Sequence, residues 1–99
     1  MRNVIVRYRV RPERIAANEA LVRAVYDELA VLRPAGLRYG TFQLDDPARF
    51  LHLASIEGDG ESPLATVEAF LAFVADIRGR CEEPPATSTL HRVGSYRLL

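Results

Sequence analysis

The chain has 99 residues and a mass of 11.1 kDa, which predicts a single domain over residues 1–99 and excludes the two-lobed architecture of most larger enzymes. Its composition, 48% hydrophobic and 26% charged, excludes a disordered chain. Thirteen basic residues balance thirteen acidic ones, so no basic field attracts nucleic acid or an anionic membrane, and neither is expected as a partner.

The N-terminal residues and the single cysteine indicate the cellular compartment in which the protein is expected. Residues 1–7 alternate apolar and polar side chains instead of forming an apolar leader, and no segment approaches about 18 consecutive apolar residues. Cys81 is the only cysteine, so neither an internal disulfide nor a multi-thiolate zinc site can form. We therefore expect a cytoplasmic protein without a metal centre.

The first third of the chain predicts a strand and then a long helix. Apolar residues alternate with polar ones over residues 3–10, which is typical of a strand. Pro12 and Glu13 suit the first turn of a helix. From Ile15 the apolar positions recur at three- and four-residue steps, so we expect an amphipathic helix that ends near Arg33.

The middle of the chain predicts a β-hairpin. Turn-forming residues at 45–48 separate two β-rich runs, residues 37–44 and 50–57. Neither face of the second run is convincingly polar, so this strand should be covered on both sides and lie centrally in its sheet.

The last third predicts a second helix and a final strand. An apolar helical stripe begins near Thr66, a plausible N-cap, and Gly79 weakens its end. Two prolines within residues 82–85 should break the helix completely. A last strand is then expected within residues 87–98.

This order, β-α-β-β-α-β, predicts an α+β fold of the ferredoxin-like type. Strands one and three should be central in a four-stranded antiparallel sheet, with both helices on one face. The opposite face would leave Leu51 and Leu53 uncovered. At about 25 cal/mol per Å², several wet apolar side chains cost several kcal/mol, which is comparable with the stability of a small domain. We therefore expect a homodimer that packs sheet against sheet.

In the order of its elements and in its apolar pattern, the chain resembles a known family. The run at residues 4–10 with Pro12 and Glu13, the hairpin over residues 37–56 and a short second helix before a final strand look like the antibiotic biosynthesis monooxygenase group. The resemblance implies a dimeric α+β barrel with a pocket in each subunit between the sheet and its helices. It also implies oxidation of aromatic substrates, or haem degradation, without a conventional flavin or metal cofactor.

The sequence departs from the haem-degrading branch of that group. Catalytic members carry an asparagine on strand one, a tryptophan at the end of strand three and a histidine on helix two. The best-aligned positions here hold Val6 and Ile56, the chain has no tryptophan, and the second helix has no histidine. None of those roles is carried over, and haem degradation is not expected.

His52 is the most conspicuous polar residue, because it interrupts an apolar central strand and must find hydrogen-bond partners. A four-residue hairpin loop would place Thr41 opposite it and Tyr39 on the same face. This cluster could orient a phenolic or enolic substrate, with His52 as the proton acceptor. A one-residue change in the loop would remove the cluster. The alternative is a hydrogen-bonded structural histidine.

Aromatic residues offer a second candidate feature. Phe70 and Phe73 of the second helix, with Tyr8 and Tyr26, either wall a pocket for an aromatic ligand or simply pack the core.

Four other residues have plainer interpretations. We expect His91 on the surface or in a dimer contact, and Cys81 as a partly buried, inert thiol. Arg7 and Arg9 either bind an acid inside the dimer or form interface salt bridges.

Two functions therefore remain open from the sequence. In the first, the chain is a cofactor-independent monooxygenase-like enzyme acting on an aromatic or polyketide-type compound. His52 and Tyr39 would be catalytic, and Thr41, Phe70, Phe73 and Tyr8 would bind the substrate. The alternative is a non-catalytic dimeric protein that binds a small molecule or acts as an accessory, with a purely structural homodimer as a third option.

Overall fold

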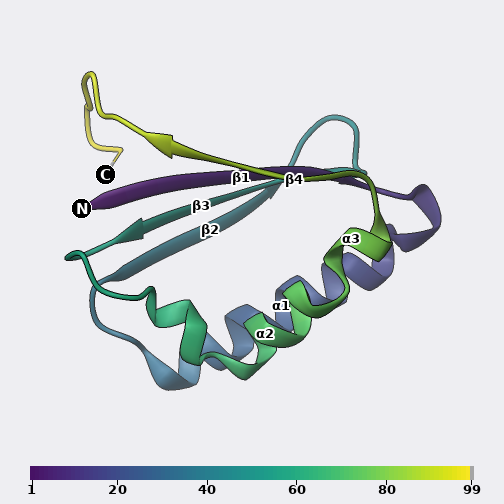
Figure 1. Ribbon diagram of the computed structural model, residues 1–99, viewed down its shortest axis with the longest axis horizontal. Helices are drawn as coiled ribbons and strands as arrows, with labels where there is room; N and C mark the ends of the chain where they lie inside the picture. Colours follow the sequence, from purple (N-terminus) through teal and green to yellow (C-terminus); the bar gives the residue numbers. More distant parts are fainter. Residues whose placement is uncertain (99) are drawn as a thin grey trace.

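A computed structural model describes residues 1–98 and contains one four-stranded antiparallel sheet in the order β2-β3-β1-β4 (Figure 1). Strands β1 and β3 are central, as predicted, and the fold is ferredoxin-like. The elements are β1 (Arg2–Val10), α1 (Ile15–Leu32), β2 (Leu37–Gln43), β3 (Arg49–Ile56), α2 (Glu68–Ala75), α3 (Ile77–Arg80) and β4 (Cys81–Leu90).

Helix α1 lies on one face of the sheet and ends where the sequence predicts. Its buried side chains are Asn18, Val22 and Val25, which recur at helical spacing. Arg33 adopts a left-handed backbone conformation, φ 47°, and its N–H donates to the carbonyl of Leu29 at 2.8 Å. This bond satisfies one of the carbonyls that a helix end leaves free.

The hairpin has the predicted register. The N–H of Leu44 donates to the carbonyl of Arg49 at 3.0 Å, which closes a four-residue loop over residues 45–48. Asp46 shapes this loop, because its carboxylate accepts from the N–H of Ala48. Thr41 consequently pairs with His52 across β2 and β3.

The second helical region begins differently from the prediction. Thr66 is not an N-cap; it ends a 3₁₀ turn, Pro63–Thr66, and its hydroxyl donates to the carbonyl of Pro63. Helix α2 starts two residues later. Its first N–H groups, those of Glu68 and Ala69, donate to the carboxylate of Glu28 on α1 at 3.1 and 2.8 Å. An acidic side chain from a neighbouring helix therefore caps α2, which a local sequence pattern does not reveal.

Strand β4 corrects the prediction for the C-terminal third. It begins at Cys81, earlier than expected, and ends at Leu90 instead of continuing to residue 98. The helical region ends at Arg80, before the two prolines, but these lie inside β4 and not ahead of it. Between the pairs Arg7–Ala86 and Arg9–Glu83, β4 has one residue more than β1, so the prolines lie in a β-bulge of an edge strand, where a missing N–H costs little.

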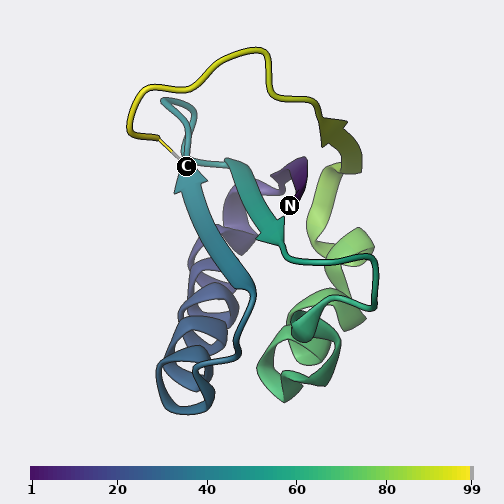
Figure 2. The ribbon, with the colours of Figure 1, turned by 90° about the vertical axis from the view of Figure 1, so that its left-hand side faces the viewer.

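The two faces of the sheet are unequal. Both helical segments lie on one side, and residues 91–98 pass over the other side from the end of β4 toward β2 (Figure 2). On the helix side Tyr8, Val10 and Phe50 are buried with the helices. On the other side Leu51 and Leu53 are half-buried and no helix of residues 1–98 covers them. No helix in this part of the chain has the length and apolar character needed to cross a membrane.

Candidate functional site

A cavity of about 330 Å³ lies between the sheet and helices α2 and α3. Val4, Val6 and Ile56 of the sheet form an apolar wall, and Phe70 and Ile77 form the helical side. Ligand pockets of small-molecule proteins begin at about this volume and have the same mostly apolar lining with a few polar groups.

His52 supplies the polar centre of this cavity. Strand β3 turns its side chain toward the helices, and it is 4% exposed. Its Nε2 lies 2.7 Å from the Tyr8 hydroxyl. Its Nδ1 lies 2.8 Å from the Tyr39 hydroxyl and 2.9 Å from that of Thr41. The structure thus brings together the three residues that the hairpin register groups, and adds Tyr8 from β1.

This cluster carries no charge at neutral pH. Burial lowers the pKa of His52 to about 4, so the imidazole is neutral at pH 7. Burial raises the pKa of Tyr8 well above its usual value, although the hydrogen bond from Asn18 opposes this effect. Burial also raises the pKa of Tyr39, so both phenols keep their protons.

Two residues that the sequence analysis missed extend the cluster into the core. The Asn18 amide nitrogen donates to the Tyr8 hydroxyl at 2.9 Å. Arg80 Nε donates to the Asn18 amide oxygen at 3.1 Å, and Arg80 Nη2 donates to the carbonyl of Phe73 at 2.5 Å. The sequence could have revealed Asn18, because it is a polar residue on the apolar stripe of α1, together with Val22. No comparable pattern marks Arg80.

Aromatic rings surround the imidazole. Tyr8 stacks on His52 with ring centroids 5.3 Å apart, and the Phe73 centroid lies 5.2 Å from that of His52. Phe70 meets Tyr39 edge-on at 6.4 Å. These rings both line the cavity and pack against the core, so the two interpretations of the aromatic residues are not exclusive. Tyr26 lies outside the cavity lining, where its hydroxyl is 2.7 Å from that of Thr41.

Solved structures share this arrangement of elements over nearly the whole chain. The first, named "Putative antibiotic biosynthesis monooxygenase from Nitrosomonas europaea", superposes with a TM-score of 0.75 at 20% identity and covers 95% of this chain and 100% of that one. This chain has the antibiotic biosynthesis monooxygenase fold. The family resemblance that the sequence suggested is confirmed at the level of the fold.

Two further solved structures share this fold. One named antibiotic biosynthesis monooxygenase has a TM-score of 0.69 at 23% identity and covers 95% of this chain and 100% of its own. Rv0793 from Mycobacterium tuberculosis has a TM-score of 0.71 at 21% identity, covering 95% and 96%. No protein-family model and no curated protein matches the sequence.

The remaining predicted residues lie away from this cavity. His91 follows β4 and is exposed. Cys81 is buried at the start of β4, and burial raises the pKa of its thiol, which makes it unreactive. Arg7 is exposed, whereas Arg9 forms ion pairs with Asp46 and Glu82 within the subunit. Residues 1–98 hold no group of three His, Cys, Asp or Glu side chains suited to a metal ion.

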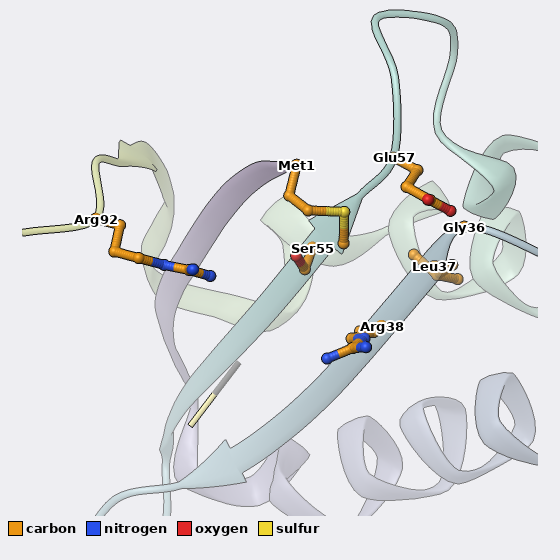
Figure 3. Close-up of a pocket in the computed structure, with 7 residues that line it drawn as sticks. All are labelled: Met1, Gly36, Leu37, Arg38, Ser55, Glu57 and Arg92. Carbon is orange, nitrogen blue, oxygen red and sulfur yellow. The ribbon is translucent and has the colours of Figure 1, made fainter. Parts of the chain in front are cut away.

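A second hollow, of about 450 Å³, lies on the opposite side of the sheet. Figure 3 shows Arg92 extending toward Ser55, and Arg38 beside them on β2. The side chains of Arg38, Glu57 and Arg92 are exposed and form no hydrogen bond with the described residues. Because none of residues 1–98 holds these charged groups in place, the helix-side cavity is the candidate functional site.

Proposed function

We propose that this chain is a cytoplasmic, cofactor-independent monooxygenase-like enzyme that acts on a planar aromatic or polyketide-type compound. The observation that carries the proposal is the apolar cavity with one polar cluster, His52 and Tyr39, fixed by hydrogen bonds. The names of the solved structures with the same fold support it.

The proposed reaction converts a methylene group, activated by a neighbouring carbonyl and aromatic rings, into a carbonyl. The substrate loses a proton to give an enolate, which transfers an electron to O₂, and the two radicals combine to form a carbon–oxygen bond. The resulting hydroperoxide loses its remaining C–H proton, the O–O bond breaks, and water leaves. One CH₂ group and one O₂ give one C=O group and one H₂O, so the substrate supplies all the electrons.

The neutral imidazole of His52 is the simplest proton acceptor in the cavity. If the substrate has the pKa of a phenol, about 10, transfer to a base of pKa about 4 is uphill by six pKa units, about 8 kcal/mol. A turnover of about 10 s⁻¹ corresponds to a barrier of about 16 kcal/mol. The proton transfer would account for half of that barrier, and the reaction of the enolate with O₂ would account for the rest.

Aerobic incubation with a dihydroxyanthracene-type phenol or its keto form tests the proposal. We expect quinone to appear with uptake of one O₂ per product. His52→Gln should lower the rate at least about a hundredfold, which is the usual contribution of a general acid–base group. His91→Gln is the matched control, because His91 is exposed and remote from the cavity. An unchanged rate in His52→Gln would remove His52 from the mechanism.

One observation favours the alternative of a non-catalytic binding protein. Both ring nitrogens of His52 already face protein hydroxyls, so no nitrogen is free for a substrate unless a hydrogen bond rearranges. Binding of the same compounds, measured by fluorescence or calorimetry, without oxygen uptake would support this alternative.

We also propose a homodimer in which the two uncovered sheet faces meet. Ile5, Leu51 and Leu53 share this face and are only half-buried, and Phe42 beside them is 56% exposed. A second copy of the chain would cover this strip and remove its apolar surface from water.

Leu53→Glu should separate the dimer, because it would bury a carboxylate in an apolar interface. We expect sedimentation at micromolar concentration to change from a 22 kDa species, twice the 11.1 kDa chain mass, to the single chain. Val31→Glu introduces the same charge on α1, at a side chain that is 80% exposed, and should leave the mass unchanged. A wild-type protein that sediments as one chain would contradict the proposal.

A further inference from the structure

The hydrogen bonds that lead from Arg80 to the cavity have a single direction. A guanidinium can only donate, so the Asn18 oxygen must be the atom that faces Arg80 Nε at 3.1 Å. The amide nitrogen of Asn18 then faces Tyr8 and donates to its hydroxyl oxygen at 2.9 Å. Arg80 thereby fixes the orientation of the Asn18 amide, an assignment that the amide itself would leave open.

The hydroxyl of Tyr8 continues the same donor-to-acceptor direction to His52. The hydroxyl oxygen accepts from Asn18, and among residues 1–98 its own proton has one acceptor, His52 Nε2, at 2.7 Å. If Nε2 carried the ring proton and donated to Tyr8, the proton of the buried Tyr8 hydroxyl would lack an acceptor, at a cost of about 1 to 3 kcal/mol. Because neutral histidine carries one ring proton, that proton belongs on Nδ1.

The hydrogen bonds on the other side of the imidazole, at Nδ1, depend on this tautomer. Nδ1 faces the hydroxyls of Tyr39 and Thr41, and the Thr41 hydroxyl also has that of Tyr26 at 2.7 Å. When Nδ1 donates, His52 does not need the proton of Tyr39. That proton, on a side chain that lines the cavity, is available to a ligand. When Nδ1 accepts, it draws a proton from the hydroxyl of Tyr39 or Thr41, so the ring competes with a ligand for the Tyr39 proton.

We propose that Arg80 and Asn18 are positioning residues that hold His52 in the Nδ1–H tautomer and so make Tyr39 a hydrogen-bond donor to an enolate or phenolate oxygen. The choice of this ligand class rests on the proposed function, whereas the tautomer rests on the contacts alone. Arg80 has no carboxylate partner among residues 1–98, so its charge is not cancelled there. The aligned donors therefore polarise one another toward the cavity.

In this arrangement Tyr39 is the residue that contacts the substrate oxygen, and the tautomer of His52 acts on the substrate through Tyr39. The Tyr39 hydroxyl donates to the carbonyl oxygen of the substrate, and the bond strengthens as negative charge develops on that oxygen in the enolate. By lowering the energy of the enolate, this hydrogen bond reduces the uphill cost of the proton transfer to His52.

Asn18→Asp provides the decisive test, because the side chain keeps its shape but can only accept. The introduced carboxylate would pair with Arg80 and accept the Tyr8 proton, so Tyr8 would accept from Nε2–H and the tautomer would invert. Two-bond ¹H–¹⁵N correlation spectra distinguish a bare ring nitrogen from a protonated one by its chemical shift. His91, which is exposed, supplies an internal reference in the same spectra.

We expect the Nδ1–H form of His52 in the wild-type protein and the Nε2–H form in Asn18→Asp. An Nε2–H wild type, or an Asn18→Asp variant with the same tautomer as the wild type, would overturn the proposal, since a purely structural role predicts no inversion. Tyr8→Phe is the second variant should Asn18→Asp fail to fold. It removes the donor to Nε2 and should leave a mixture of both tautomers.

The ligand class is tested with 2-naphthol, whose neutral and ionised forms differ in absorbance. The wild-type protein should bind the naphtholate at least about tenfold more tightly than naphthol, which lowers the apparent pKa of the bound ligand by about one unit. Asn18→Asp and Tyr39→Phe should both lose this preference, and equal affinities in the wild type would contradict the ligand assignment. Because the spectra need no substrate, an Nδ1–H tautomer without turnover would contradict only the monooxygenase function, whereas turnover with an Nε2–H tautomer would contradict only this inference.

Discussion

Replacing Arg80 with methionine is expected to lower the free energy of unfolding by about 3 to 5 kcal/mol. Arg80 is 1% exposed, and its guanidinium donates to the Asn18 side chain and to the carbonyl of Phe73. Methionine fills a similar volume but donates nothing, so both acceptors would remain buried without a partner. Loss of a third or more of the stability of a small domain should lower its melting temperature by more than about 10 °C.

Arg78→Met is the matched control. Arg78 lies on the same helix α3 but is exposed, so its replacement should change the unfolding free energy by no more than about 0.5 kcal/mol. Urea titration of both variants measures the difference. Equal midpoints would show that Arg80 contributes no more than an exposed arginine. The double variant Arg80→Met with Asn18→Leu should lose less than the sum of the two single changes, because the Asn18 oxygen is then also absent.

The surroundings of Arg80 explain how an arginine with no carboxylate partner among residues 1–98 can be buried. Phe73 is in the last turn of α2, where backbone carbonyls lose their partners within the helix and the helix dipole is negative. The guanidinium carbon also lies 5.4 Å from the centre of the Phe73 ring, in a cation–π contact. The end of α2 therefore takes the place of an acidic side chain.

The hairpin and its register were predictable because they depend on short-range features. Turn-forming residues fix a four-residue loop, and the two-residue period of a strand then places Thr41 and Tyr39 on the His52 face. The strand order follows from the handedness of β-α-β connections. These inferences need only the residues beside each other in the chain and general rules of connection.

The features that escaped prediction depend on contacts between distant segments. Nothing local separates buried Arg80 from exposed Arg78, since only the tertiary fold places Asn18 against one of them. The cap of α2 by Glu28 joins residues 40 positions apart. The start of β4 ahead of its two prolines was also missed, because a strand tolerates them here only through a bulge that the pairing with β1 creates.

Acidification from pH 7 to pH 4 is expected to lower the free energy of unfolding by about 3 kcal/mol through His52 alone. Its pKa is about 4 in the folded chain and about 6.5 in the unfolded one, a difference of about 2.5 units at about 1.4 kcal/mol each. Between these values the unfolded state binds the proton and the folded state does not. The stability is therefore complete above pH 6.5 and is lost as the pH falls toward 4.

Urea titrations at half-unit pH steps and fixed protein concentration measure this effect, and His52→Gln should flatten the profile between pH 4 and 6.5. His91→Gln should keep the wild-type slope, because His91 is exposed. Carboxylates affect the free energy of unfolding in a different pH range. The hydrogen bonds of Arg9 to Asp46 and of Arg49 to Glu83 hold the pKa values of these acids below their usual range, so their contribution is lost only at lower pH.

A wild-type slope that persists in His52→Gln would mean that the imidazole is solvated or already protonated in the folded state. The hydrogen-bond direction through Tyr8 would then lose its basis, because a protonated ring donates from both nitrogens. A slope confined to His52 would instead establish a neutral imidazole, which both the proton acceptor and the Tyr39 donor arrangement require. The pH profile of stability therefore limits the chemistry of the cavity before any substrate is known.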